Sequence, residues 1–487
     1  MNFNSEQWAN IHKTFEKIWG YKEFRPPQKE VINCLLEGRD ALIIMPTGGG
    51  KSICFQLPAL LKTGLTIVIS PLVALMENQV NDLKNKNIPI ELLHNEIPRR
   101  QRKITLDKIN KQQIRLLYLS PETLLSIPVW QLLIQPHIEI NGLILDEAHC
   151  LVQWGETFRP SYSRLGAVRQ TLLKDKISSK KIVIAAFTAT ADLQSQEIIK
   201  SSLRLQNAQT FAISPYRSNL SLAIKIAWNP RCRRHQLLNF IKRQQKQSGL
   251  VYIRSRAESE ELSQYLQKLG YKVVAYHAGL SALKRREIEE KWLEDKLQFV
   301  ICTSAFGLGI NKPDVRWVVH YQAPFLLSEY LQEIGRGGRD GKNTKTLTLI
   351  SEPTGWLDST DQQRNKYFLQ QLHKNYQQTK RYFYQIPKQG NIIDLKEEIP
   401  KIEIISSLLY RWKKLKWINP FDYELIADIS SLNIGKIIKK SQQELQQMKQ
   451  YLMTRSCRWQ YILNAFGFIK EAKGFNCGHC DNCQRRR

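Results

Sequence analysis

Short runs of apolar residues recur along the first two thirds of the chain, and each ends in polar or glycine residues. They are too short for buried helices, and helical patterns at 257–269 and 282–294 separate members of the later series. Buried strands that alternate with helices are typical of parallel sheets built from βαβ units. The first series lies at 41–45, 66–70, 115–120, 142–146 and 181–187, and the second at 250–254, 272–277, 299–303, 315–321 and 346–350.

Two such series predict an α/β fold with two parallel-sheet domains that meet between residues 205 and 222. The length agrees, because 487 residues exceed what one hydrophobic core usually holds. After about residue 360 the chain becomes mainly helical and more basic, with 23 Lys and Arg against 11 Asp and Glu in residues 361–487. We therefore expect four parts, at 1–210, 211–355, 356–445 and 446–487.

The charge of the whole chain indicates a polyanionic partner. Lys and Arg outnumber Asp and Glu by 72 to 44, which gives a net charge of +28. Such an excess attracts nucleic acid, and the alternative is a lysine-rich surface that serves solubility. The polar first ten residues are no signal peptide, and no apolar run is long enough to cross a bilayer. We expect a soluble, cytoplasmic protein that does not contact a membrane.

The first predicted strand runs into the sequence PTGGGKS at 46–52, and a helical pattern follows. Glycines let backbone N–H groups close around phosphate oxygens, a lysine reaches the β- and γ-phosphates, and a serine hydroxyl ligates Mg²⁺. A chance Gly-Lys-Ser triplet would lack this order of strand, loop and helix. The expected phosphate and magnesium contacts are Thr47, Gly48, Gly49, Gly50, Lys51 and Ser52.

The predicted strand at 142–145 ends in the acids Asp146 and Glu147. An acid at the end of a buried strand beside a phosphate loop is placed to hold Mg²⁺, which we assign to Asp146. Glu147 can then orient and deprotonate the attacking water. The alternative is an acid-rich helix N-terminus, which is common but needs no phosphate loop nearby.

A Gly-rich stretch at 332–339 gives the second domain two arginines, Arg336 and Arg339. A guanidinium group stabilises the charge on a phosphoryl group during transfer. An arginine from another domain acts only when the two domains close, which is the physical basis of a motor. An exposed basic turn is the competing interpretation.

Together these segments resemble the RecQ branch of superfamily-two helicases, over most of the first 350 residues. Further segments carry the likeness: FRPPQ at 24–28, SPLVALM at 70–76, FTATA at 187–191, YHAGL at 276–280 and FGLGINKP at 306–313. The resemblance implies two tandem RecA-like domains that use ATP. It also assigns Arg25 and Gln28 to adenine recognition, for which an amide offers one donor and one acceptor, and Ser70 to the DNA path.

The segment DEAHCLVQWGETFRPSY at 146–162 is similar to the family's aromatic-rich loop, which senses single-stranded DNA and triggers hydrolysis. The resemblance makes Trp154 and Phe158 stacking faces for bases and Arg159 a phosphate contact. Buried core aromatics are the alternative. The chain departs from the family at Glu156-Thr157, where His-Asp is usual, and at Glu77, where a Lys is common. Both changes remove favourable contacts near DNA.

Four of the nine cysteines gather near the end of the chain and match the family's zinc element. A set of four thiolates suits a structural, tetrahedral Zn²⁺ and leaves no position open for water. His479 is a rival ligand that four thiolates make unnecessary, and disulfides are the alternative that a reducing cytosol disfavours. The expected ligands are Cys457, Cys477, Cys480 and Cys483.

The resemblance implies a DNA helicase that couples hydrolysis of ATP with Mg²⁺ to 3′-to-5′ movement on single-stranded DNA, in recombination, repair and replication. Its partners would be single-stranded and partly duplex DNA, and we expect a chromosome-associated monomer. An RNA helicase and a non-catalytic, zinc-bearing nucleic-acid-binding protein are the alternatives.

The chain ends four residues after Cys483, so we expect no winged-helix or further helical domain there. A helical stretch at 395–415 and a hairpin around Asn419-Pro420 predict a winged-helix-like insert instead. We expect Arg411, Lys413, Lys414 and Lys416 of this insert to touch duplex phosphates, or the insert only to brace the motor.

Overall fold

The computed structural model describes residues 5–46, 48–153, 159–174, 181–306, 312–428 and 434–486. It divides into two compact units. The first unit contains the described residues up to 213 together with 377–428, and the second contains 214–376 and 434–486. The first joint, after residue 213, lies inside the window that the sequence predicts. The chain passes between the units three times, at residues 213, 376 and 432.

The first unit is built on a parallel seven-stranded sheet in the order β3-β4-β2-β5-β6-β1-β7. Alternate residues of β1 face two separate cores. Leu42 and Ile44 belong to the core on one face of the sheet, and Ala41 and Ile43 belong to the core on the other face. The strands are β1 (Ala41–Ile44), β2 (Leu65–Ile69), β3 (Ile90–Leu93), β4 (Leu116–Leu119), β5 (Ile140–Leu145), β6 (Val183–Thr188) and β7 (Gln209–Ala212). The helices are α1 (Ser5–Trp19), α2 (Gln28–Leu36), α3 (Lys51–Leu61), α4 (Val73–Lys84), α5 (Arg99–Asn110), α6 (Pro121–Leu124), α7 (Ile127–Leu133), α8 (Cys150–Gln153), η1 (Pro160–Ala167), α9 (Val168–Lys174) and α10 (Leu193–Ser202).

The second unit contains a parallel six-stranded sheet in the order β10-β11-β9-β12-β13-β8. Its strands are β8 (Leu220–Ala227), β9 (Gly249–Tyr252), β10 (Val273–Tyr276), β11 (Phe299–Cys302), β12 (Trp317–His320) and β13 (Thr344–Ser351). Its helices are α11 (Pro230–Arg243), α12 (Arg256–Lys268), α13 (Ala282–Leu293) and α14 (Leu327–Ile334). The prediction of two tandem parallel-sheet domains is confirmed, and every one of the predicted strands is present.

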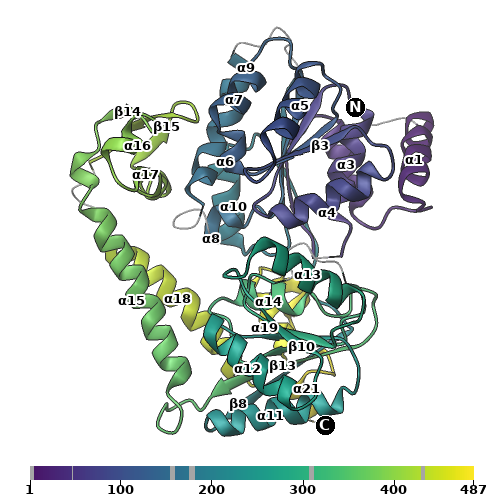
Figure 1. Cartoon of the computed structure of the whole chain (residues 1–487), viewed down its shortest axis with the longest axis vertical. Coiled ribbons are helices and arrows are strands. Elements are labelled where there is room, and N and C mark those ends of the chain that lie inside the picture. Colours follow the sequence, from purple (N-terminus) through teal and green to yellow (C-terminus); the bar gives the residue numbers. More distant parts are fainter. Residues whose placement is uncertain are drawn as a thin grey trace. The chain divides into compact units, whose positions relative to one another are not determined.

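A long helix, α15 (Thr360–Lys380), leads out of the second unit into a small insert that belongs to the first (Figure 1). The insert has a three-stranded antiparallel sheet in the order β14-β16-β15, so the predicted hairpin is present. The expected segment 356–445 is therefore divided between the two units. Insert elements are η2 (Phe383–Gln385), β14 (Gln389–Asn391), α16 (Leu395–Glu398), α17 (Ile402–Arg411), β15 (Leu415–Trp417) and β16 (Asp422–Leu425).

The chain returns to the second unit through α18 (Ile434–Met453), followed by α19 (Arg458–Ala465), α20 (Ile469–Ala472) and α21 (Asp481–Gln484). This segment shares one hydrophobic core with β8 and α14, in which Tyr330, Tyr451 and Trp459 are almost fully buried. Within the described ranges, no helix combines the length and the apolar character that a membrane span requires.

Candidate nucleotide and zinc sites

The phosphate loop connects β1 to the N-terminus of α3, as the sequence predicts. Gly48 and Gly50 have φ values of 84° and 77°, in the left-handed region that favours glycine. A Cβ on Gly49 would lie 3.1 Å from the Pro46 carbonyl oxygen, so this turn accepts little more than hydrogen. Lys51 and Ser52 are the first residues of α3, whose N-terminus attracts anions. Thr47 lies outside the described residues.

Gln28 lies directly against this loop. Its side chain is almost fully buried and donates from Nε2 to the Gly50 carbonyl oxygen at 3.2 Å. Its Oε1 accepts from the Arg25 backbone N–H at 2.9 Å, while the Arg25 side chain is exposed. The two residues assigned to adenine recognition are thus brought to the edge of the loop, and their role there stays a prediction.

The two acids follow β5 and face the loop. Glu147 Oε1 lies 3.9 Å from Lys51 Nζ, which is buried and has no hydrogen-bond partner among the described residues. Burial and then the adjacent Glu147 charge raise the pKa of Asp146 to about 6. A buried ammonium without a hydrogen bond to the described residues, beside two carboxylates, fits a site for a phosphate and a divalent cation, and the roles of Ser52 and Asp146 as the cation's ligands stay predictions.

Two residues that we did not assign from the sequence complete this site. His149 Nδ1 lies 3.1 Å from Glu147 Oε2 and 3.3 Å from the Thr188 hydroxyl. The Thr188 hydroxyl also donates to the Thr190 carbonyl oxygen at 3.2 Å, inside the segment FTATA. The fourth letter of the Asp-Glu-Ala-His sequence was the available signal for His149.

The residues assigned to DNA are only partly described. Trp154 and Phe158 lie outside the described residues, as do Glu156 and Thr157. Arg159 Nη1 donates to Glu122 Oε2 at 3.0 Å and Nη2 donates to the Pro71 carbonyl oxygen at 2.5 Å. Its guanidinium group therefore already binds two protein groups, and its Nε has no hydrogen-bond partner among the described residues.

The neighbouring segment of the expected DNA path is also described. Ser70 is buried, and its hydroxyl has no hydrogen-bond partner among the described residues. Glu77, which stands where the family often has Lys, lies 3.7 Å from the Nε2 atom of His94. The acid at this position is therefore engaged within its own domain.

In the second unit, the arginine-bearing turn directly follows α14. Gly338 has φ 53°, and a Cβ there would lie 2.5 Å from both Asn219 Nδ2 and Thr344 Oγ1. Asn219 also donates to the Gly338 carbonyl oxygen at 2.8 Å. These contacts fix the backbone between Arg336, which is buried, and Arg339, which is partly exposed. Their role in hydrolysis stays a prediction.

A buried ion pair that the sequence did not indicate lies at the end of α14. Arg254 donates to both carboxylate oxygens of Glu333, at 3.1 and 2.7 Å. Burial would raise the pKa of Glu333, but Arg254 and then His320, at 3.0 Å, hold it below its usual value. The charged carboxylate ties the start of the arginine-bearing turn to the end of β9.

The four cysteines at the end of the chain converge on one point. Their Sγ atoms lie within 4.8 Å of one another, close to the spacing of about 3.8 Å in a tetrahedron of 2.3 Å Zn–S bonds. The Cys477 and Cys480 backbone N–H groups donate to the sulfurs of Cys457 and Cys477, both at 3.3 Å. His479 is outside the cluster, and its Nδ1 lies 2.6 Å from the Cys477 carbonyl oxygen. The donor set therefore fits Zn²⁺, as predicted.

This cluster is fastened to the edge strand β8. Asp481 accepts from the Ile224 backbone N–H at 2.9 Å and pairs with Arg458 at 2.6 Å. The Ser221 hydroxyl donates to the His479 carbonyl oxygen at 2.6 Å. A metal that orders residues 477–483 would therefore also protect an otherwise open sheet edge.

Three sequence families match the chain: DEAD/DEAH box helicase at 25–199, helicase conserved C-terminal domain at 232–341, and RecQ zinc-binding at 427–484. The ATP-dependent DNA helicase RecQ of Synechocystis is 51% identical over 97% of this chain and 98% of its own length. The chain belongs to the RecQ family. The RecQ helicase of Haemophilus influenzae is 38% identical over 70% of this chain, and the match spans 54% of that protein.

Solved structures of more distant helicases support the fold of this RecQ chain. The DUF1998 helicase MrfA bound to DNA and AMPPNP has a TM-score of 0.60 at 17% identity and covers 87% of this chain and 63% of its own. Yeast Dbp5 bound to RNA and ADP BeF3 has a TM-score of 0.59 at 17% identity, over 73% of this chain and 92% of its own. The shared feature is the pair of RecA-like domains.

Proposed function

We propose that this RecQ chain is an ATP-dependent DNA helicase that moves 3′ to 5′ on single-stranded DNA and unwinds duplexes. The observation that carries the proposal is the near full-length likeness to a protein named as such a helicase, together with a complete set of competent residues at the phosphate loop. We place its action in the cytoplasm on chromosomal DNA, as a monomer, in recombination, repair and replication.

The proposed roles follow from the geometry of the first unit. Lys51 would hold the β- and γ-phosphates, and Ser52 and Asp146 would hold the Mg²⁺ that offsets the phosphate charge. Glu147 would accept a proton from the attacking water, and its contact with His149 at 3.1 Å supports a fixed orientation of the carboxylate. Arg339 from the second unit would stabilise the transferred phosphoryl group.

Direction and substrate are tested together. Duplexes with a 3′ tail, a 5′ tail or no tail are incubated with ATP and Mg²⁺, and unwinding is measured by gel shift. We expect unwinding only with the 3′ tail, and none with Lys51→Ala. A parallel measurement compares stimulation of ATP hydrolysis by single-stranded DNA and RNA. Unwinding from 5′ tails alone, or stimulation by RNA alone, would contradict the proposal.

We further propose that the insert is a winged-helix-like element that contacts duplex phosphates through Lys413, Lys414 and Lys416. The order strand, two helices and hairpin supports this, and Lys413 and Lys416 are exposed. Arg411 is not part of this surface, because its Nη1 donates to the Val152 carbonyl oxygen at 2.7 Å. The expectation that Arg411 touches phosphates is therefore withdrawn.

The three lysines are tested by exchanging them for Gln and measuring duplex affinity against salt concentration. Each lost phosphate contact should flatten the log–log slope by about 0.9. An unchanged slope with unchanged unwinding would leave the insert without a role in duplex binding.

A further inference from the structure

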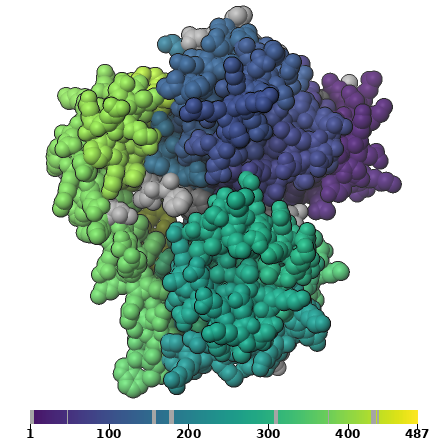
Figure 2. All heavy atoms as spheres, in the orientation of Figure 1, coloured from purple at the N-terminus to yellow at the C-terminus, as the bar shows by residue number. Residues whose placement is uncertain are grey.

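The insert is packed against the segments on either side of residues 154–158. In the segment that follows residues 154–158, Ala167 of η1 is buried in the insert's own core together with Ile405, Leu409 and Trp417. A Cβ on the neighbouring Gly166 would lie 2.0 Å from the Ser202 carbonyl oxygen, so η1 and α10 are in close contact there. The insert thus shares part of its core with the first domain. In Figure 2 the surface of the insert, in light green, lies against the blue surface of that domain.

Polar contacts fix the same interface. The Tyr410 hydroxyl donates to the Ser202 carbonyl oxygen at 3.1 Å, and Arg204 Nη2 donates to the Trp417 carbonyl oxygen at 2.7 Å. Arg164, which is almost fully buried, lies 3.7 Å from Glu403. Several independent bonds therefore hold α17 in one position on the first domain, and Arg411 is the last residue of that helix.

In the segment that precedes residues 154–158, the end of α8 is bound by Arg411. Its Nη1 donates to the Val152 carbonyl oxygen at 2.7 Å. Because α8 is only four residues long, its last carbonyl groups have no partner within the helix. A guanidinium group at a helix C-terminus supplies that partner and is favoured by the helix dipole.

From Val152 a series of contacts leads back to Glu147, the proposed general base. The Val152 backbone N–H donates to the His149 carbonyl oxygen at 2.9 Å, and the His149 ring lies 3.1 Å from Glu147 Oε2. The Cys150 backbone N–H donates to the Glu147 carbonyl oxygen at 3.0 Å. Glu147 itself has φ 52°, a conformation that a non-glycine residue keeps only when its surroundings hold it.

We infer that Arg411 is a positioning residue for ATP hydrolysis: by binding Val152 it holds α8, and through His149 it holds the Glu147 carboxylate in the orientation that DNA binding uses. The inference rests on the proposed helicase function. Because the insert is joined at both ends to the second unit, through α15 and α18, it makes the position of Glu147 sensitive to the motor's second half. Arg411 contacts neither nucleotide nor DNA in this role.

The test measures ATP hydrolysis by the full chain against increasing single-stranded oligothymidylate. For Arg411→Ala we expect basal hydrolysis within about twofold of the wild type and a maximal stimulated rate lowered about fivefold or more, a typical size for coupling between sites. The DNA concentration for half-maximal stimulation and the salt dependence of binding should stay unchanged, because no phosphate contact is lost.

Three further variants separate this role from charge and from folding. Lys388→Ala removes an exposed cation of the insert that has no proposed role in binding, and it should behave as the wild type. Arg411→Lys keeps a donor for the carbonyl oxygen and should recover part of the stimulation. Tyr410→Phe removes only the hydroxyl bound to Ser202 and should lower stimulation in the same direction, which covers the case that Arg411→Ala does not fold.

The outcomes are distinct. A wild-type protein whose hydrolysis ignores single-stranded DNA would overturn the proposed function itself. Normal stimulation in Arg411→Ala, or an equal loss in Lys388→Ala, would overturn the inference while leaving the helicase assignment intact. A lower affinity for DNA at an unchanged maximal rate would show that Arg411 is a DNA contact and would also overturn the inference.

Discussion

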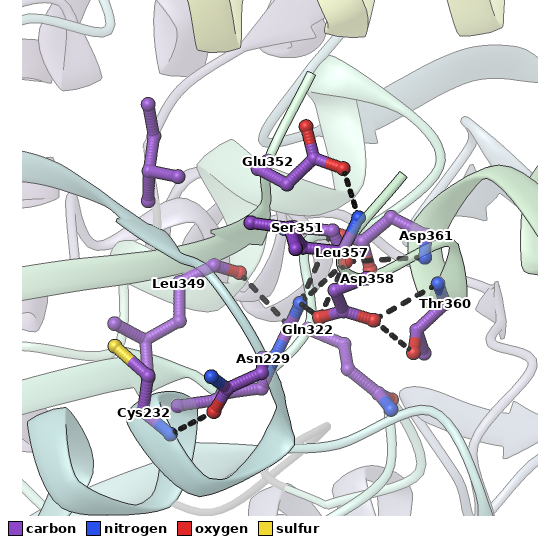
Figure 3. Close-up of polar contacts among 12 residues, drawn as sticks. Asn229, Cys232, Gln322, Leu349, Ser351, Glu352, Leu357, Asp358, Thr360 and Asp361 are labelled. Carbon is purple, nitrogen blue, oxygen red and sulfur yellow. Dashed lines mark hydrogen bonds and ion pairs between the residues drawn. The ribbon is translucent and has the colours of Figure 1, made fainter. Parts of the chain in front are cut away.

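The start of α15 is attached to the second sheet by a buried arginine, Arg233 of α11. Its Nη2 lies 2.7 Å from the Ser351 hydroxyl and 3.3 Å from Asp358 Oδ2, and its Nη1 donates to the Tyr321 carbonyl oxygen at 2.7 Å. Figure 3 shows Asp358 among Ser351, Thr360 and Asp361, at the point where β13 gives way to the helix. Arg233 and Asp358 are 3% and 4% exposed.

The substitution Arg233→Leu removes the cation and leaves the Asp358 carboxylate buried. Breaking one side of a buried pair costs about 3–5 kcal/mol. Asp358 keeps hydrogen bonds from the Thr360 backbone N–H at 3.1 Å and the Ser351 hydroxyl at 3.0 Å. We therefore expect a destabilisation at the lower end of this range, about 3 kcal/mol. This corresponds to a roughly 100-fold rise in the equilibrium constant for local opening of this segment.

The loss should depend on pH. Burial would raise the pKa of Asp358, but hydrogen bonds from Thr360 and Ser351 and the Arg233 charge hold it below its usual value. A lowered folded-state pKa contributes stability above the unfolded pKa, and that contribution is lost as the pH falls through the folded pKa. Without Arg233 the Asp358 carboxyl protonates more readily. The difference in the free energy of local opening between the variant and the wild type should therefore become smaller below about pH 4.

Hydrogen exchange of the peptide 351–366 measures this opening directly. We expect the amides there to exchange about 100-fold faster in Arg233→Leu at neutral pH, while β9 and β11 stay protected. Arg231→Leu, an exposed cation on the same helix, serves as the matched control and should change little. Unchanged protection in Arg233→Leu would refute the reasoning that this pair anchors α15.

Three more predictions concern the chemical sites. Lys51→Ala and Glu147→Gln should both abolish hydrolysis, but a titration with fluorescent ATP should show binding retained only for Glu147→Gln; near-normal turnover in either would contradict the motor assignment. Arg339→Ala should lower turnover by about 10³ and affinity for ATP far less, and equal losses would exclude a finger role. Elemental analysis should find one zinc per chain, and chelation should unfold the segment that holds Cys457 and Cys483 while ATP binding persists; absence of zinc with paired, oxidised cysteines would refute this.

The sequence predicted the central strands of both sheets and the edge strand β10, and missed the other three edge strands, β3, β7 and β8. A central parallel strand is covered on both faces and therefore reads as an unbroken apolar run, as at 41–45. Strand β7 (Gln209–Ala212) has three of its four residues exposed, and much of β8 (Leu220–Ala227) alternates between buried and less buried residues because its side chains point in turn to the two faces of the sheet. Patterns of that kind resemble loops or hairpins until the neighbouring segments are known.

The loop at 48–52 and three of the four clustered cysteines could be picked out from the sequence because each group stands at short sequence spacing. Asp146, Glu147 and Cys457 lie outside these groups and were added from the resemblance or from their place after a predicted strand. The pair of Arg254 and Glu333 could not be predicted, because the two residues lie 79 positions apart and meet only when β9 and α14 are in place. Proximity of this sort depends on the tertiary fold, and no local pattern records it.

The position of the insert was hidden for a different reason. Besides the ion pair of Arg164 and Glu403, several polar contacts between the insert and the first domain are accepted by backbone carbonyl groups, among them those of Val152, Ser202 and Pro420. A carbonyl group is present at every residue, so the accepting side of such a bond leaves no trace in the sequence. The donor of such a bond can be recognised in the sequence only as a basic residue. Arg411 was therefore assigned to a phosphate contact, whereas in the structure it binds the Val152 carbonyl oxygen.

The three passages of the chain between the units restrict how the motor can move. Covalent connections cannot lengthen, so any movement of one unit against the other is taken up where the chain passes between them, at residues 213, 376 and 432. Helix α15 is continuous from Thr360 to Lys380 and spans the second of these points, with Arg233 and Asp358 fixing its start. A continuous helix transmits displacement along its axis rather than absorbing it. Displacement that reaches the insert meets the first domain at Arg411 and Val152, five residues from Glu147, which we propose activates the attacking water.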